Sequence, residues 1–137
     1  MRGALHHLEL WVPDLQRAIS TWGWLLEQLG YAVHQDWEHG RSWRLDPAAA
    51  AQGGGYVVVE QSPALTGGHV RTRAGLNHVA FRAGTSAEVD ALVTAAPAHG
   101  WTLLFADRHP YAGGRDHYAA YLENADGFEV ELVAEPD

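Results

Sequence analysis

The sequence predicts an α+β fold built from two copies of one βαβββ module. The order strand, helix, three strands occurs twice along the 137 residues. In addition, the 53-residue spacing between His7 and Glu60 recurs, 71 residues later, between His78 and Glu131. Each histidine opens an extended run and each glutamate closes one. A repeat that reproduces both the elements and these side chains indicates two similar units facing each other around a site.

The first module, about residues 1–62, begins with an alternating strand at 5–12 that places His7, Glu9 and Trp11 on one face. Asp14 is in the N-cap position of a helix over 15–29, where apolar residues recur at helical spacing. Gly30 follows at the C′ position. The remaining elements are strands at about 31–37, 41–45 and 56–61, a turn at 38–40 and a loop at 46–55.

The second module, about residues 76–137, repeats this order after a glycine-containing linker at about 63–75. Its first strand covers 76–82, and the sequence from Thr85 to Glu88 has the form of a capping box for a helix ending near His99. Pro97 disturbs the last turn of that helix. Strands follow at about 101–106, 117–122 and 127–133. Because neither module alone would bury much core, we expect a single domain over 1–137.

The composition argues against several classes of function. The formal net charge is −8 and the nine Lys and Arg residues are scattered, which argues against a nucleic-acid partner. With no cysteine, the chain has no disulfide, thiolate nucleophile or cysteine-bound metal. No signal peptide is visible at the N-terminus, and no apolar run is long enough to span a membrane. We therefore expect a cytoplasmic protein without a membrane partner.

Two strings resemble patterns of a known family. The string HLELWVPDL opens the first module at His7, and the string NADGFEVEL at Asn124 closes the second. With the repeated βαβββ order, they make the whole chain resemble the vicinal oxygen chelate superfamily. That superfamily includes glyoxalase I, methylmalonyl-CoA epimerase, fosfomycin and bleomycin resistance proteins, and extradiol dioxygenases. The resemblance implies that the two modules form a half-open barrel with ligands directed into its cleft.

The four repeated side chains are the predicted metal ligands. Imidazole and carboxylate groups suit nickel, cobalt, manganese, iron(II) or zinc, and the sequence does not choose among these ions. His6 competes with His7 for the first position, and the resemblance selects His7. The resemblance implies one divalent metal ion per site, with either glutamate able to act also as a general base. The predicted ligands are His7, Glu60, His78 and Glu131.

The subfamily is less well specified. Glyoxalase I enzymes commonly have an arginine where this chain has Trp11, and the epimerases usually have glutamine where it has Glu60. The subset His7, His78 and Glu131 matches the extradiol dioxygenase triad, and Tyr121 stands where those enzymes have an active-site tyrosine. A ligating Glu60 would, however, occupy a position that oxygen chemistry needs.

Three functional hypotheses follow. The first is a metal-dependent, glyoxalase-like enzyme with lyase or isomerase chemistry on a small carbonyl or vicinal-oxygen compound. The second is a metal-free resistance protein that sequesters a hydrophobic, antibiotic-like molecule, and the third is an extradiol dioxygenase-like enzyme. In each case the partner is a small molecule, and we expect a homodimer because exposed sheet edges and faces favour pairing.

Aromatic residues are the predicted contacts to this small molecule. Trp11 is expected to face the cleft, with Trp37 and Trp43 beside it, whereas Trp22, Trp24 and Trp101 are expected in the core or in a dimer contact. The segment 108–117, which contains Tyr111 and His117, is either a substrate lid or a solvated loop. His117 is the predicted accessory acid or base, and Tyr121 is either catalytic or a packing residue.

Overall fold

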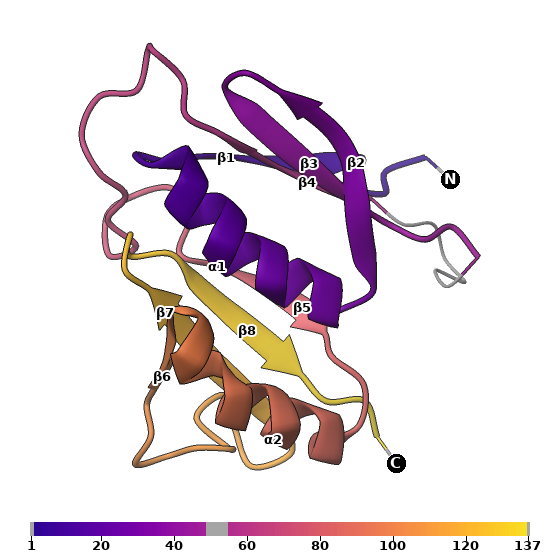
Figure 1. Cartoon of the computed structure of the whole chain (residues 1–137). Helices are drawn as coiled ribbons and strands as arrows, with labels where there is room; N and C mark the ends of the chain where they lie inside the picture. The colour runs from indigo at the N-terminus through magenta and orange to yellow at the C-terminus, as the bar shows by residue number, and fades with distance from the viewer. Residues whose placement is uncertain (1, 49–54, 137) are drawn as a thin grey trace. The chain divides into compact units, whose positions relative to one another are not determined.

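Two four-stranded sheets, each with one α-helix, make up the protein in a computed structural model that describes residues 2–48 and 55–136 (Figure 1). The chain divides into a first unit, Met1–Gly68, and a second unit, His69–Asp137. The boundary falls inside the predicted linker. The α+β class and the two βαβββ modules are confirmed, and the sheets remain separate and unclosed. Most of the predicted loop at 46–55 lies outside the described residues.

The first unit follows the predicted order. Its sheet has the strand order β1-β4-β3-β2, with β1 parallel to β4 and the other neighbours antiparallel. Helix α1 packs on this sheet, as Figure 1 shows. The elements are β1 (His7–Trp11), α1 (Leu15–Gln28), β2 (Tyr31–Trp37), β3 (Gly40–Leu45) and β4 (Tyr56–Glu60).

Local signals set the ends of α1, and the hydrophobic effect fixes its position. The Asp14 side chain accepts a hydrogen bond from the Arg17 backbone N–H at 2.9 Å, and Gly30 has the left-handed φ of 92° expected at C′. The buried side of the helix includes Trp22, which is 0% exposed. Trp43 of β3, also 0% exposed, lies directly against Gly23, whose missing side chain leaves room for the indole.

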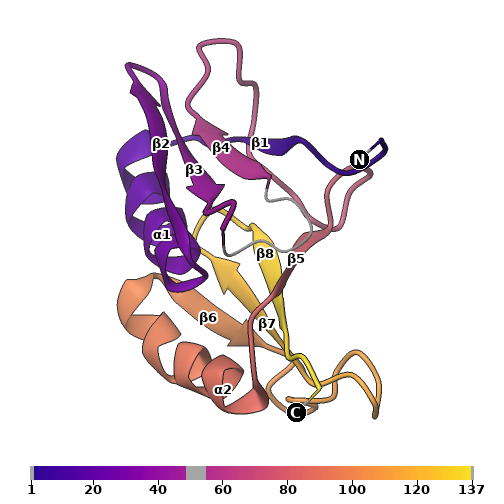
Figure 2. The same cartoon turned by 90° about the vertical axis from the view of Figure 1, so that its right-hand side faces the viewer.

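The second unit repeats the topology with the strand order β5-β8-β7-β6. Strand β5 is parallel to β8, and the other pairs are antiparallel. Helix α2 lies beside this sheet and contacts β7 (Figure 2). The elements are β5 (His78–Arg82), α2 (Ser86–Ala95), the 3-10 turn η1 (Ala96–His99), β6 (Trp101–Leu104), β7 (Ala119–Asn124) and β8 (Glu129–Val133).

Backbone chemistry explains where the second unit agrees with the predicted boundaries and where it differs. Thr85 and Glu88 form the predicted capping box at the start of α2. The α-helix ends at Ala95, and the residues around Pro97 continue as a 3-10 turn, since proline cannot donate the next helical hydrogen bond. Strand β6 ends two residues early because Phe105 adopts a left-handed φ of 54°. Strand β7 begins two residues later than predicted.

Candidate functional site

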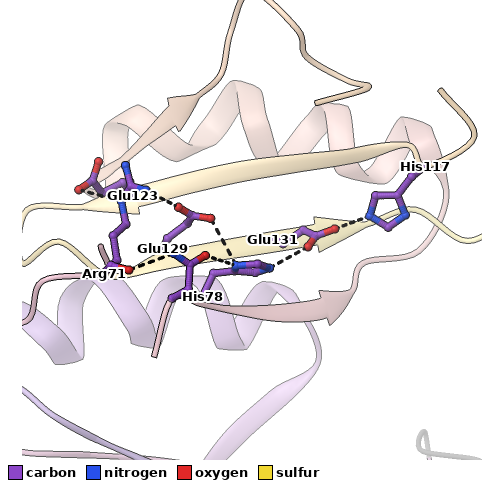
Figure 3. Close-up of polar contacts among 7 residues, drawn as sticks. Arg71, His78, His117, Glu123, Glu129 and Glu131 are labelled. Carbon is purple, nitrogen blue, oxygen red and sulfur yellow. Dashed lines mark hydrogen bonds and ion pairs between the residues drawn. The ribbon is translucent and has the colours of Figure 1, made fainter. Parts of the chain in front are cut away.

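A cluster of charged side chains lies on β5 and β8 of the second unit (Figure 3). His78 opens β5, and its Nε2 atom is 3.1 Å from Oε1 of Glu131. Nε2 of His117 contacts the other oxygen of the same carboxylate. Glu131 therefore lies between two imidazoles, one from a strand and one from the loop before β7. The structure brings together three residues that the sequence singled out.

Further partners surround His78 on its other side. Its Nδ1 atom is 2.7 Å from Oδ1 of Asn77 and 3.6 Å from Oε2 of Glu129. The guanidinium of Arg71 pairs with Glu129 at 2.9 Å and approaches Glu123 at 3.8 Å. Arg71 comes from the predicted linker, which therefore contributes directly to the cluster.

Burial makes these carboxylates electrostatically costly. Glu129 is 4% exposed and Glu131 is 6% exposed, and both point to the same side of β8 because they are two residues apart. A buried carboxylate is stable only with compensating partners. Arg71 offsets the charge of Glu129. Around Glu131 the partners are imidazoles and a phenol, so a cation there would be favourable.

Tyr121 stands opposite Glu131 in the pairing of β7 with β8. Burial, followed by the nearby charge of Glu131, raises the pKa of the Tyr121 hydroxyl above its usual value. A phenol that keeps its proton is a hydrogen-bond donor. The loop before β7 packs closely here, since a Cβ added to Gly113 would lie 2.5 Å from the Tyr121 oxygen and 2.7 Å from Cδ2 of His117.

Tyr111, a predicted substrate contact, lies at the exposed part of the same loop. It is 50% exposed, and its ring meets the Tyr118 ring edge-on at 5.7 Å. Tyr118 in turn donates a hydrogen bond to Asp90 of α2 at 2.5 Å. This contact ties the end of the loop to the helix.

The Tyr118–Asp90 contact predicts a specific pH dependence. The hydrogen bond to Asp90 raises the pKa of Tyr118 to about 12. Because the folded pKa lies above the ordinary value of about 10, the stabilisation is complete below pH about 10 and is lost as the pH rises through 12. In an ultraviolet titration we expect one tyrosine to ionise at about pH 12, and Tyr118→Phe to remove that step. Retention of the step in this variant would contradict the assignment.

The first unit presents different contacts around its histidine. The His7 ring stacks on Tyr56 with centroids 4.7 Å apart, and its Nδ1 atom is 2.9 Å from Nδ1 of His6. Glu60 instead accepts a hydrogen bond from the Trp37 indole N–H at 3.3 Å. The structure therefore places His7 and Glu60 in separate groups of contacts.

The strand register gives the physical reason. His7 pairs with Tyr56, so that Glu60 lies opposite Trp11. Four residues along a strand span about 13 Å, too far for His7 and Glu60 to converge as neighbouring ligands while both side chains stand perpendicular to the sheet.

In the second unit the register is different. His78 pairs with Glu129, which puts Glu131 only two residues beyond the partner of the histidine. The residue of the first unit at the position of Glu131 is therefore Val58, and Glu60 corresponds to Val133. The two His–Glu pairs therefore have the same spacing in the sequence, but Glu60 and Glu131 occupy different positions relative to the histidines of their sheets.

The predicted aromatic contacts also separate into two groups. Trp11 and Trp37 are 41% and 37% exposed on the side of the first sheet that carries His7. Trp43 faces α1 on the opposite side and is fully buried. Because a core indole cannot also contact a ligand beyond the other face, the structure assigns Trp43 to packing rather than to substrate binding.

Within residues 2–48 and 55–136, no three side chains of His, Cys, Asp or Glu are already arranged as a metal-binding group. Two of the described imidazoles, those of His78 and His117, each bring a nitrogen to an oxygen of the Glu131 carboxylate. The described part of the chain also contains no helix that is long and apolar enough to cross a membrane.

Comparison with known proteins decides the family. Residues 6–121 match the model of the Glyoxalase/Bleomycin resistance protein/Dioxygenase superfamily. The chain belongs to this superfamily. The uncharacterised protein YqjT of Bacillus subtilis (strain 168) is 42% identical over 132 residues, covering 95% of this chain and 98% of YqjT.

Solved structures of the superfamily show the same fold. A glyoxalase candidate from Bacillus halodurans has a TM-score of 0.86 at 39% identity, covering 98% of this chain and 97% of that one. The fosfomycin resistance protein FosX of Listeria monocytogenes, in complex with Mn(II) and sulfate, has a TM-score of 0.63 at 19% identity. That match covers 99% of this chain and 93% of FosX. At this identity the FosX likeness concerns the fold alone.

Four members of the cluster were not predicted from the sequence: Arg71, Asn77, Glu123 and Glu129. Glu129 had a usable signal, since it shares a strand face with Glu131 and a second buried acid needs a cationic partner. Arg71 had none, because it lies in a segment whose composition indicates only a linker.

Proposed function

We propose that this protein is a metal-dependent enzyme that carries out lyase or isomerase chemistry on a small carbonyl or vicinal-oxygen compound. One observation carries the proposal. Nε2 of His78 and Oε1 of Glu131 are 3.1 Å apart while Nδ1 of the same ring is engaged by Asn77. Such an arrangement is typical of a metal-ligating histidine, whose second nitrogen is held by a neighbouring acceptor.

The geometry and charge of this pair fit a divalent ion. Adjacent ligands of an octahedral ion, each about 2.1 Å from it, lie about 3 Å from one another. The observed separation of 3.1 Å is close to that value. A divalent ion would also offset the buried charge of Glu131, for which the neighbouring side chains supply no permanent cation.

Each side chain has a proposed role. His78 and Glu131 hold the ion, and His7, from the same chain or from the partner of a homodimer, is retained from the sequence as a further imidazole ligand. When bound, the ion would polarise a carbonyl oxygen as a Lewis acid. The Tyr121 hydroxyl, which is hydrogen-bonded to Glu131 in the free protein, would turn to donate to a bound substrate, and Nε2 of His117, in contact with the second oxygen of Glu131, would act as the accessory acid or base.

Glu60 is assigned to the substrate side of the first sheet. Its hydrogen bond with Trp37 and its pairing opposite Trp11 place a carboxylate between two exposed indoles. We propose that these three residues contact the substrate and that Glu60 is not a ligand of the ion held by His78.

Metal titration of the metal-free protein tests the proposal. Untagged protein should bind nickel, cobalt, manganese or zinc in calorimetry at one ion per site, and the loaded protein should convert members of a panel of small carbonyl compounds. His78→Ala should abolish binding, whereas His39→Ala, in the exposed β2–β3 turn, should not. Failure of the wild-type protein to bind any of these ions would overturn the enzyme hypothesis and favour the metal-free binding protein.

A second candidate, an extradiol dioxygenase-like enzyme, gains support from Val58. With valine at the position equivalent to Glu131, the expected protein ligands reduce to His7, His78 and Glu131, a two-histidine, one-carboxylate set. Under the proposal that Glu60 is not a ligand, it would leave an open position on the ion for oxygen. Protein loaded anaerobically with iron(II) should then consume oxygen when catechols are added, and no consumption with any catechol would exclude this candidate.

The homodimer expected from the sequence is part of the same proposal. Light scattering at micromolar concentration should give about twice the chain mass of 15.0 kDa. A clean monomer would contradict it.

A further inference from the structure

Asn77 occupies a position between two fixed groups of the second unit. Its side-chain Nδ2 donates a hydrogen bond to the backbone carbonyl of Arg71 at 3.0 Å. Its Oδ1 is 2.7 Å from Nδ1 of His78. The carbonyl of Arg71 can only accept, so the amide nitrogen must point toward it and the amide oxygen must point toward His78. The orientation of the Asn77 amide is therefore determined.

This orientation fixes the location of a proton on the neighbouring ring. An amide oxygen is an acceptor only, so the 2.7 Å contact requires that Nδ1 of His78 carry hydrogen. In the neutral ring, Nε2 then presents a lone pair toward Oε1 of Glu131, itself an acceptor when ionised. Glu129, with Oε2 at 3.6 Å from Nδ1, favours the same tautomer through its negative charge. Two facing lone pairs form a position suited to a cation.

The first unit has a polar side chain at the same position. His6 precedes His7 as Asn77 precedes His78, and Nδ1 of His6 lies 2.9 Å from Nδ1 of His7. In both units the residue before the strand histidine therefore engages Nδ1 and leaves Nε2 free of that neighbour. Because the contact to Nδ1 occurs in both modules, it indicates a shared role in orienting the strand histidine rather than an isolated packing contact.

We propose that Asn77 is a positioning residue that holds His78 as the Nδ1–H tautomer and thereby directs the Nε2 lone pair to the metal. The carbonyl of Arg71 determines the orientation of the amide that does this. The inference rests on the proposed function for the presence of the metal, but the tautomer itself is a property of the metal-free protein. An experiment can therefore contradict the tautomer of His78 without contradicting metal binding, and the reverse.

Nitrogen-15 NMR of the imidazoles tests the tautomer directly. At about pH 8.5, metal-free wild-type protein should show His78 protonated at Nδ1 and bare at Nε2. Asn77→Leu should shift the proton to Nε2, where it can bond Glu131. Asn77→Asp, which keeps an acceptor, should retain the wild-type pattern, and the His99 signals should be unchanged in both variants.

Zinc affinity provides the second measurement. Asn77→Leu should weaken zinc binding by about 10- to 100-fold, the usual effect of removing an outer partner of a metal-bound histidine, and Asn77→Asp should restore most of it. A wild-type His78 protonated at Nε2, or at both nitrogens, overturns the inference whatever the variants do. The predicted tautomer in a protein that binds none of nickel, cobalt, manganese and zinc would support the assignment of the tautomer and contradict the proposed function.

Discussion

Glu131→Gln should reduce the affinity for divalent metal ions by at least about 100-fold and remove metal-dependent turnover. The amide is neutral and a poor ligand, and it also loses the anionic partner that faces His78 at 3.1 Å. The affinity is measured by calorimetry on metal-free protein. Circular dichroism should remain that of the wild type, because the substitution preserves the size of a side chain that is 6% exposed.

Glu135→Gln is the matched control for that experiment. Glu135 follows β8 and pairs with the exposed Arg82 at 2.7 Å, away from the imidazoles. The same change of carboxylate to amide should leave metal affinity unaltered there. Equal affinity of the Glu131→Gln variant and the control would mean that Glu131 is not a ligand, and the proposed site would have to be abandoned.

Trp43→Ala should lower the free energy of unfolding by about 3–5 kcal/mol, the range for removing a large aromatic side chain from a core. Trp43 is 0% exposed and packs against Gly23 of α1, so the helix cannot close the cavity without moving. Urea denaturation followed by circular dichroism measures this loss. The magnitude is a large part of the total stability of a domain of this size.

Trp37→Ala is the comparison that separates packing from binding. Trp37 is 37% exposed and keeps one hydrogen bond to Glu60, so its removal should cost about 1 kcal/mol or less. We expect it to weaken substrate binding instead. If Trp37→Ala destabilised the protein as much as Trp43→Ala does, the division of the aromatic residues between core and ligand surface would be wrong.

Features encoded by neighbouring residues could be predicted from the sequence. The N-cap at Asp14, the capping box at Thr85 and the C′ position of Gly30 each depend on a few adjacent side chains and backbone groups. All the groups that form each of these caps lie within about one helical turn of one another in the sequence. The element order followed from these signals and from the hydrophobic period.

Features set by pairing between distant strands could not be predicted in the same way. The interval of 53 residues between His7 and Glu60 does not say which residue of β4 lies opposite which residue of β1. Trp43 raised a similar difficulty, because β3 has buried residues on both faces, Ser42 among them, and alternation alone does not identify the helix side.

The candidate site was partly predictable for the same reason. His78 and Glu131 carry a recognisable ligand chemistry, and the loop histidine His117 was expected to assist them; the structure brings all three together. Arg71 and Asn77 act through contacts that depend on how the linker returns to β8 and β5. Such contacts are not indicated by any motif or hydrophobic period in the sequence.

The two-residue difference in register between the modules has a consequence for how a duplicated unit diversifies. A slip of one residue would turn every side chain of a strand to the other face and expose the core. A slip of two preserves the alternation, so Val57 and Val59 still face the helix, as Val130 and Leu132 do in the other copy. Only the pairing on the open face changes. Val58 lies opposite the third residue of β1, where Glu131 lies opposite the third residue of β5. One copy can thereby lose an acidic group while its interior stays intact, so the open faces of the two sheets can diverge in chemistry without a change in either core.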